Sequence, residues 1–213
     1  MSDYGVVIGL DLSLTAPGIA RILEPWGDEP AHAVATTLDR VPTTEQDRGL
    51  VLHEAAERIA QRAGALTALT TGERLAVMEA LLLQSANGKA MERAAFWWMV
   101  RAQLELRGFE VVSVHPTSRR SIAMDDAARA EWRNAPKHQK AAAGKRAVLA
   151  SVRRRWPGVV LPDDNAADAL VCAEVGAHRA GFAGLPYLAG PQMKSLLNAT
   201  EALGITERAR DGA

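Results

Sequence analysis

Residues 6–11 of the sequence, Val-Val-Ile-Gly-Leu-Asp, place five apolar residues directly before an aspartate. The run is too short for an ordinary helix and has the composition of a buried strand. Residues 15–18, Thr-Ala-Pro-Gly, then favour a turn, and residues 18–23 and 33–38 have the pattern of two further strands. We therefore expect the chain to open with an antiparallel meander of three strands, the first of which ends on Asp11.

Helices and strands alternate in the next part of the chain. Apolar residues recur at helical spacing over 47–65 and again over 87–107. Between these helices, the apolar run at 75–78 predicts a fourth strand that ends on Glu79, and residues 109–114 predict a fifth strand. This order predicts an α/β fold with a mixed five-stranded sheet flanked by helices.

Composition excludes several classes of protein. The chain has 213 residues, of which 48% are hydrophobic and 23% charged, as is typical of one globular domain. The single cysteine, Cys172, excludes an internal disulfide and a cysteine-rich zinc site. No apolar run reaches the roughly 18 residues of a membrane span. The first apolar run also lacks a preceding basic segment, so we expect no membrane segment, no secretory signal and a cytoplasmic protein.

The zero formal net charge conceals a strongly basic segment at 115–157. This segment contains 11 basic and 3 acidic residues, a local balance of +8, so the rest of the chain carries −8. Two interpretations stay open on charge alone: a solvated helix surface, or a surface that binds a polyanion.

Three acidic residues stand where chemistry is often placed. Asp11 and Glu79 end predicted strands, and Asp168 lies in the first turns of a helix predicted over about 165–180. Spacings of three and four residues place Asp164 or Asn165 on the same helix face as Asp168. Converging carboxylates repel one another unless a cation neutralises them, and Mg²⁺ prefers such oxygen ligands. The alternative is a turn residue, a surface strand end and a capped helix start with no shared role.

Several segments resemble the motifs of RuvC-type Holliday-junction resolvases. Residues 8–20, Ile-Gly-Leu-Asp-Leu-Ser-Leu-Thr-Ala-Pro-Gly-Ile-Ala, are similar to the opening motif, and residues 164–170, Asp-Asn-Ala-Ala-Asp-Ala-Leu, to the terminal acidic motif. The other matching segments are 77–79 with 87–90 (Val-Met-Glu and Asn-Gly-Lys-Ala), 114–117 (Val-His-Pro-Thr) and 137–148. The resemblance spans about residues 5–180, which implies an RNase H-like nuclease domain at 1–180. Residues 181–213 then form a C-terminal extension with a short helix near 193–203.

The resemblance implies a divalent-metal-dependent endonuclease that resolves four-way or other branched DNA. Two Mg²⁺ or Mn²⁺ ions would be held by Asp11, Glu79, Asp168 and position 165, with Asp11 between them. Position 165 is a carboxylate in the family and Asn165 here, which ligates a cation without adding charge. Asp164 lies next to it, about 100° away around the helix, and is the alternative metal ligand that could complete this site in place of Asn165.

The basic segment is the expected DNA-binding surface under this resemblance. The residues predicted to contact phosphates are Lys137, Lys140, Lys145, Arg146, Arg119 and Arg120. A resolvase cuts two strands symmetrically, so a homodimer is expected. The adjacent Trp97 and Trp98 point about 100° apart on their helix. Two interpretations stay open: one tryptophan faces a second subunit, or both pack in the core.

Two other functions stay open at this point. One is a junction-binding protein that does not cleave, because Asn165 weakens the metal site. The other is an RNA-processing nuclease on the same fold. Compact resolvases of this kind occur in bacteria and in their viruses. The expected location is therefore the bacterial cytoplasm, or the cytoplasm of the host cell if the protein is encoded by a phage.

Overall fold

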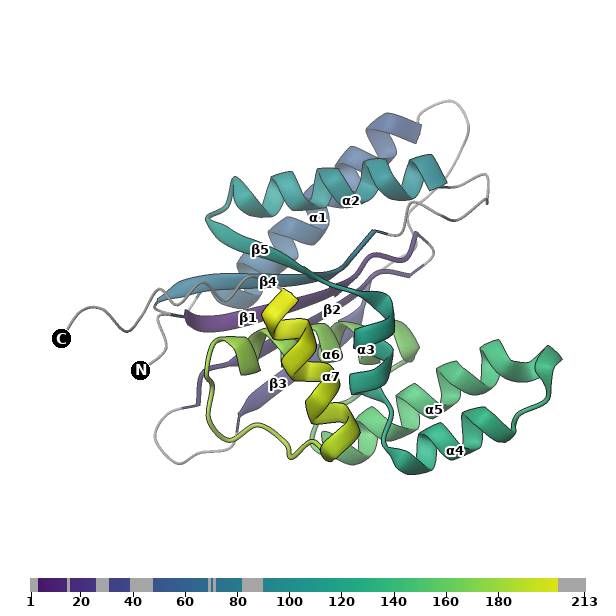
Figure 1. Ribbon diagram of the computed structural model, residues 1–213. Coiled ribbons are helices and arrows are strands. Elements are labelled where there is room, and N and C mark those ends of the chain that lie inside the picture. Colours follow the sequence, from purple (N-terminus) through teal and green to yellow (C-terminus); the bar gives the residue numbers. More distant parts are fainter. Residues whose placement is uncertain are drawn as a thin grey trace.

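A five-stranded sheet lies between two groups of helices (Figure 1). The computed structural model describes residues 4–14, 16–25, 31–38, 48–68, 70, 72–81 and 90–202. The strands are β1 (Tyr4–Asp11), β2 (Gly18–Leu23), β3 (His32–Thr37), β4 (Glu73–Glu79) and β5 (Phe109–Val114). Their order across the sheet is β3-β2-β1-β4-β5.

The sheet is mixed, as the sequence predicts. Strand β2 pairs antiparallel with both β1 and β3, whereas β1 pairs parallel with β4 and β4 parallel with β5. Parallel neighbours need crossover connections, and helices α1 (Arg48–Thr67) and α2 (Ala90–Glu105) supply them. Leu10 pairs with Met78, so Asp11 and Glu79 end neighbouring strands at the same edge of the sheet.

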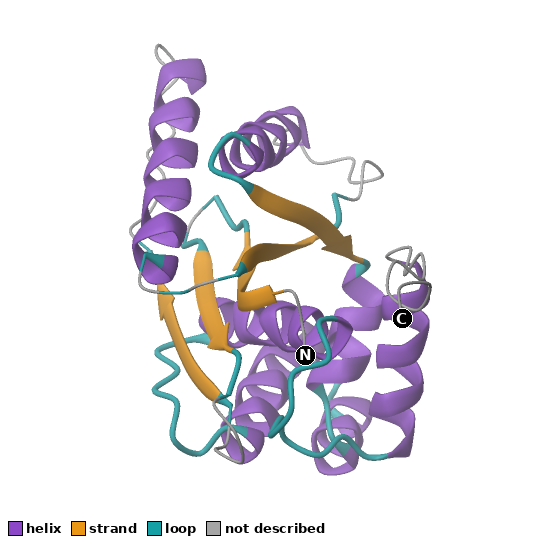
Figure 2. Cartoon of the chain, turned by 90° about the vertical axis from the view of Figure 1, so that its left-hand side faces the viewer, coloured by secondary structure: helices purple, strands orange, loops and turns teal. Residues whose placement is uncertain are grey.

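Helices α1 and α2 cover one face of the sheet, as Figure 2 shows from the side. Their inward residues, among them Ile59 and Phe96, pack on alternate residues of the strands, such as Ile8 and Met78. Residue 47 and residues 87–89, where the sequence predicts that these helices begin, lie outside the described residues.

Helix α6 (Asp164–Arg179) crosses the opposite face and packs directly on β1 and β2. Glycines make this close approach possible. A side chain at Gly9 would collide with the backbone of Ala169 and Ala173, and one at Gly18 would collide with the backbone of Asn165. The position of α6 is therefore set by contact between backbones.

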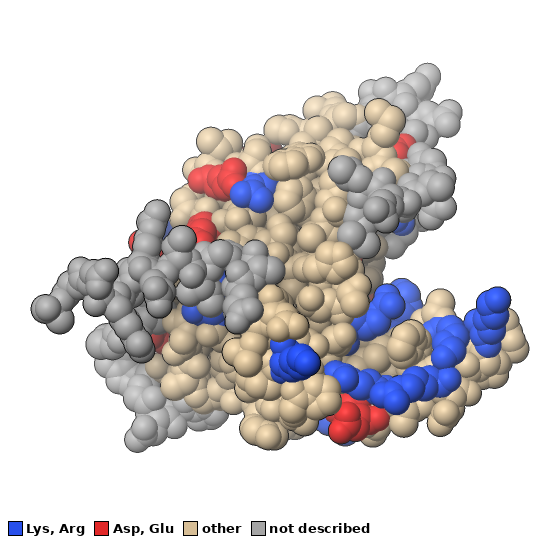
Figure 3. Space-filling model, in the orientation of Figure 1, with Lys and Arg blue, Asp and Glu red and all other residues tan. Residues whose placement is uncertain are grey.

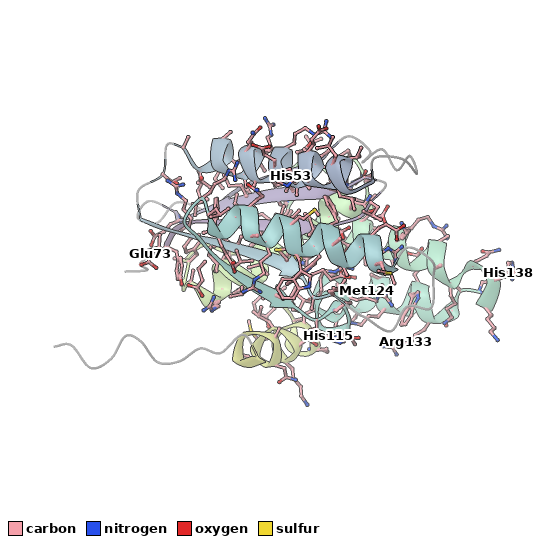
Figure 4. All side chains as sticks on the ribbon, turned by 90° about the horizontal axis from the view of Figure 1, so that it is seen from above. His53, Glu73, His115, Met124, Arg133 and His138 are labelled. Atoms are coloured by element: carbon pink, nitrogen blue, oxygen red, sulfur yellow. The ribbon has the colours of Figure 1, made fainter. Side chains whose placement is uncertain are left out.

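Two further helices form a hairpin that projects from the sheet (Figure 1). Helix α4 (Asp126–Asn134) leads through a short 3₁₀ turn, Lys137–Gln139, into α5 (Lys140–Arg155), and we call this hairpin the arm. His138 lies at its far end (Figure 4). The Asp125 side chain caps α4 by accepting a hydrogen bond from the Ala128 N–H at 2.8 Å, and Arg154 binds the same carboxylate at 2.7 Å.

A buried ion pair joins the arm to the body of the protein. Arg155 at the end of α5 donates two hydrogen bonds to the Glu174 carboxylate of α6, at 2.8 and 2.6 Å. The Trp156 indole donates to Glu174 as well, at 3.3 Å. Both charged side chains are almost fully buried, so this pair is a buried polar contact between α5 and α6.

The last described helices complete this side of the fold. Helix α3 (Pro116–Ala123) follows β5 and packs against α7 (Gly190–Ala202). Leu188 and Leu196 are buried in the same core as α6, and the Gln192 amide donates a hydrogen bond to the Ile122 carbonyl at 2.8 Å. No helix in the described ranges combines the length and the apolar character that crossing a membrane requires.

Candidate active site

Asp11 and Glu79 begin the site at the carboxyl ends of two parallel strands. The backbone around Glu79 is fixed on two sides. The Trp97 indole of α2 donates a hydrogen bond to the Glu79 carbonyl at 2.8 Å, and the Ala80 N–H donates to the Val114 carbonyl at 2.8 Å. The buried side of α2 therefore helps to hold the end of β4 in place.

Helix α6 brings Asp168 to the same edge of the sheet. Its start is fixed by Asp163, which accepts hydrogen bonds from the Ala166 N–H at 2.9 Å and from the Thr37 hydroxyl of β3 at 2.6 Å. The first turn of the helix is bound to β3 and its backbone rests on β1 and β2. The helix therefore places Asp168 near Asp11, where the charge of Asp168 helps to raise the pKa of Asp11. The predicted convergence of acidic residues from strand ends and a helix is thus present.

Arg119 lies inside this acidic cluster. It comes from α3, where its guanidinium forms ion pairs through Nε with Glu79 Oε2 and through Nη1 with Asp168 Oδ1. Its side chain is only 9% exposed. Arg119 is one of the residues predicted to contact DNA phosphates, whereas the structure places it between two of the predicted metal ligands. The spacing of Arg119 with the buried Ile122 and Ala123, three and four residues later, is the signal in the sequence for this inward position.

Burial and mutual repulsion raise the pKa values of two carboxyl groups in the cluster. The pKa of Asp11 rises from 3.8 to about 7, mainly through burial and then through the charge of Asp168. Burial also raises the pKa of Asp168 to about 6, although Arg119 opposes the change. Burial by itself lowers the pKa of Arg119, but the Asp168 and Glu79 carboxylates outweigh this and raise it, so the guanidinium stays charged.

Asp164 and Asn165 stand at the edge of the cluster. Asp164 forms an ion pair with Lys145 of α5 at 2.7 Å, and this hydrogen bond raises the pKa of Lys145. Asn165 is partly exposed and lines the adjoining cleft. Both residues therefore flank Asp168 on the side that faces the arm.

A cleft of about 450 Å³ opens beside Asp168, between α6 and the arm. Basic side chains dominate its charge, and it also contains the Trp132 ring, over which the Lys140 ammonium lies 5.1 Å from the ring centroid. The charged and amide residues that line it are Arg119, Arg120, Lys140, Lys145, Asp164, Asn165 and Asp168. Carboxylates next to a basic cleft are an arrangement that can receive a phosphate group.

The structure divides the basic segment into two sets. Lys137, Arg120 and Arg146 are exposed, and lysine and arginine side chains gather along the arm in Figure 3. Other arginines bind the protein itself, namely Arg153 with the Leu161 carbonyl, Arg154 with Asp125 and Arg155 with Glu174. Some basic residues of the segment thus bind other groups of the protein, and others are available to bind a ligand at the surface.

The donor chemistry of the cluster suits a hard divalent cation, because carboxylate oxygens and the Asn165 amide are its preferred ligands. As the side chains are placed, however, no three His, Cys, Asp or Glu residues in the described parts of the chain stand close enough to hold one ion. Arg119 occupies the space between Glu79 and Asp168. The oxygen atoms of the cluster are thus of the type that binds a divalent cation, while the Arg119 guanidinium already neutralises part of their negative charge.

The two tryptophans of α2 face different surroundings, as their spacing predicts. Trp97 is buried against the sheet, whereas Trp98 is 59% exposed. Their rings meet edge to face with centroids 4.9 Å apart. Met91, two turns before Trp98, is also exposed, so α2 exposes two large apolar side chains among charged ones.

The mixed sheet in this order, with acidic residues at the ends of β1 and β4 and a helix across them, defines an RNase H-like α/β protein. Among solved structures, the chain is similar to RuvC of Thermus thermophilus, with a TM-score of 0.55 and 18% identity over 85% of this chain and 99% of that one. The RuvC of this organism in complex with Holliday junction substrate gives the same TM-score and identity over 87% and 100% of the two chains. The yeast mitochondrial Holliday junction resolvase is 11% identical to this chain, with a TM-score of 0.44. The match covers 92% of this chain and 82% of the yeast one.

The chain thus has the fold of RuvC, and the predicted fold class is confirmed. No protein-family model matches the sequence, and a comparison with curated proteins gives no match either. The likeness is therefore one of fold, and the assignment of individual residues depends on the geometry of the site.

Proposed function

We propose that this protein is a divalent-metal-dependent endonuclease that resolves four-way DNA junctions. One observation carries the proposal: Asp11, Glu79 and Asp168 meet at one edge of the sheet beside a basic cleft. The RuvC fold supports it, since one of the similar solved structures is RuvC in complex with Holliday junction substrate.

The chain's own groups have distinct tasks in this proposal. Asp11 and Asp168 hold the cation, with Asn165 as a neutral oxygen donor beside them. The bound ion supplies the Lewis acidity and positive charge that hydrolysis of a phosphodiester requires. Arg120 and Lys145 line the cleft and orient the phosphate that is cut. Lys137 and the other exposed basic residues of the arm bind phosphates further along the DNA.

Paired cuts in opposite strands need two sites, so we propose a homodimer. Two exposed apolar side chains of α2, Met91 and Trp98, support a contact through this helix. A bacterial or phage origin and a cytoplasmic location remain predictions that accompany this function.

The deciding experiment is a cleavage assay on a labelled four-way junction, with linear duplex and an RNA hairpin as parallel substrates. Each is incubated with Mg²⁺, with Mn²⁺ and with chelator. Paired symmetric nicks in the junction, present only with metal and absent in Asp11→Asn, are expected, while Asp11→Asn still binds the junction. Tight junction binding by the unmodified protein without any cut would instead support a non-cleaving binding protein. Cleavage restricted to the hairpin would support an RNA-processing nuclease.

A further inference from the structure

The acidic cluster contains its own cation. The Arg119 guanidinium contacts Glu79 through one nitrogen and Asp168 through another, so it bridges residues from β4 and α6. The guanidinium is thus paired by charge with two carboxylates at once, and burial strengthens this attraction. The position between these two carboxylates is where a second metal ion would need its ligands.

We propose that Arg119 takes the place of one of the two metal ions, so that the site holds a single divalent cation beside a fixed guanidinium. This inference rests on the proposed metal-dependent function. The ligands left for the ion are Asp11, the part of Asp168 that Arg119 does not bind, and the neighbouring Asn165.

The formal charges agree with one ion. When all three carboxyl groups are ionised, as metal binding requires, Asp11, Glu79 and Asp168 carry three negative charges and Arg119 carries one positive charge. The sum is −2, the charge that one divalent cation neutralises. The two residues at the edge of the cluster do not change this balance. Asn165 is neutral, and Asp164 is already paired with Lys145 at 2.7 Å.

The packing of α3 holds Arg119 in this position. Ile122 and Ala123, on the same face of the helix, are fully buried, and the Ile122 carbonyl accepts a hydrogen bond from Gln192 of α7. Moving the guanidinium out would leave the Glu79 and Asp168 carboxylates without their counter-charge at a partly buried site, which is costly. The guanidinium is therefore a permanent part of the cluster.

The test is the number of ions bound per chain. Mn²⁺ binding to the full-length, metal-free protein is followed by electron paramagnetic resonance, and Mg²⁺ binding by calorimetry. The unmodified protein is expected to bind one ion at the site, and Arg119→Met to bind two, because Glu79 and Asp168 become available. Arg119→Lys, which retains a cation, and Arg120→Met, which changes the neighbouring exposed arginine on the same helix, are expected to bind one.

Thermal unfolding gives a second readout that does not depend on cleavage. Without metal, Arg119→Met is expected to melt below the unmodified protein, and Mg²⁺ is expected to raise its melting temperature by more than it raises that of the unmodified protein or of Arg120→Met. If Arg119→Met does not fold, the stoichiometry of the unmodified protein and of Arg119→Lys still decides the question.

The outcomes separate this inference from the proposed function. Two ions bound by the unmodified protein, or one ion bound by a folded Arg119→Met, would overturn the role of Arg119 and leave a metal-dependent nuclease intact. No ion bound by any of these proteins would overturn both proposals together.

Discussion

Replacement of Asp11 by asparagine is expected to stabilise the metal-free protein above neutral pH, although it removes a proposed ligand. Burial and the charge of Asp168 raise the pKa of Asp11 from 3.8 to about 7. The folded protein therefore retains the Asp11 proton up to about pH 7, whereas the unfolded chain loses it near pH 4. Between these values the native state binds more protons, so its stability falls as pH rises.

The size of the effect follows from the shift in pKa. One pKa unit corresponds to about 1.4 kcal/mol, so a rise from 3.8 to about 7 costs the folded protein about 4 kcal/mol once Asp11 is ionised. Asparagine has no proton to lose and avoids this cost. The advantage of Asp11→Asn is thus expected to be about 4 kcal/mol at pH 8 and less than half of that at pH 5.

The measurement is urea unfolding followed by circular dichroism, with chelator present, at pH 5 and pH 8. Asp126→Asn is the matched control, since Asp126 is an exposed carboxylate in the first turn of α4, and its replacement is expected to change stability by less than about 0.5 kcal/mol. An Asp11→Asn protein no more stable than the unmodified one at pH 8, or an advantage that does not vary with pH, would refute the reasoning.

Three further predictions concern the packing and the arm. Gly9→Ala is expected to cost about 3 kcal/mol or more in urea unfolding because its methyl group meets the backbone of α6, whereas Gly64→Ala in α1, which meets nothing, should be neutral or stabilising. Arg155→Met leaves the Glu174 carboxylate buried without its partner and should lower the free energy of unfolding by about 3–5 kcal/mol. The double variant, Arg155→Met with Glu174→Leu, should recover most of this loss because it removes the buried charge as well. Lys137→Ala should weaken junction binding and reduce the slope of log affinity against log salt by about 1, and an unchanged slope would remove Lys137 from the interface.

Much of the fold could be predicted because its elements have local signals. The strands at 18–23 and 109–114 agree with β2 and β5 at both ends, since turn residues and Gly108 mark their limits. The location of Asp11 and Glu79 at strand ends was predictable as well, because each follows an apolar run. That these two strands are neighbours follows from the sheet order. The start of α6 is predicted near residue 165 and observed at Asp164, with the Asp163 side chain as its cap.

The position of Arg119 could not be predicted by counting charges. A basic residue in a basic segment is expected at the surface, and only the packing of α3 on α6 and α7 turns it toward Glu79 and Asp168. The same holds for Arg155, whose partner Glu174 lies 19 residues away and becomes a neighbour only when α5 packs on α6. Long-range partners of charged groups are determined by tertiary structure, which local patterns do not contain.

The contact of α6 with Gly9 and Gly18 separates the geometry of the cluster from the identity of its side chains. Because the helix rests on the strands through main-chain atoms, the spacing between the Cα atoms of positions 11, 165 and 168 does not depend on which side chains stand there. Donors can consequently be exchanged on an unchanged frame, so Asn165→Asp adds a negative charge without moving the helix. Under the proposed function, this frame would allow metal affinity and selectivity to be tuned one ligand at a time.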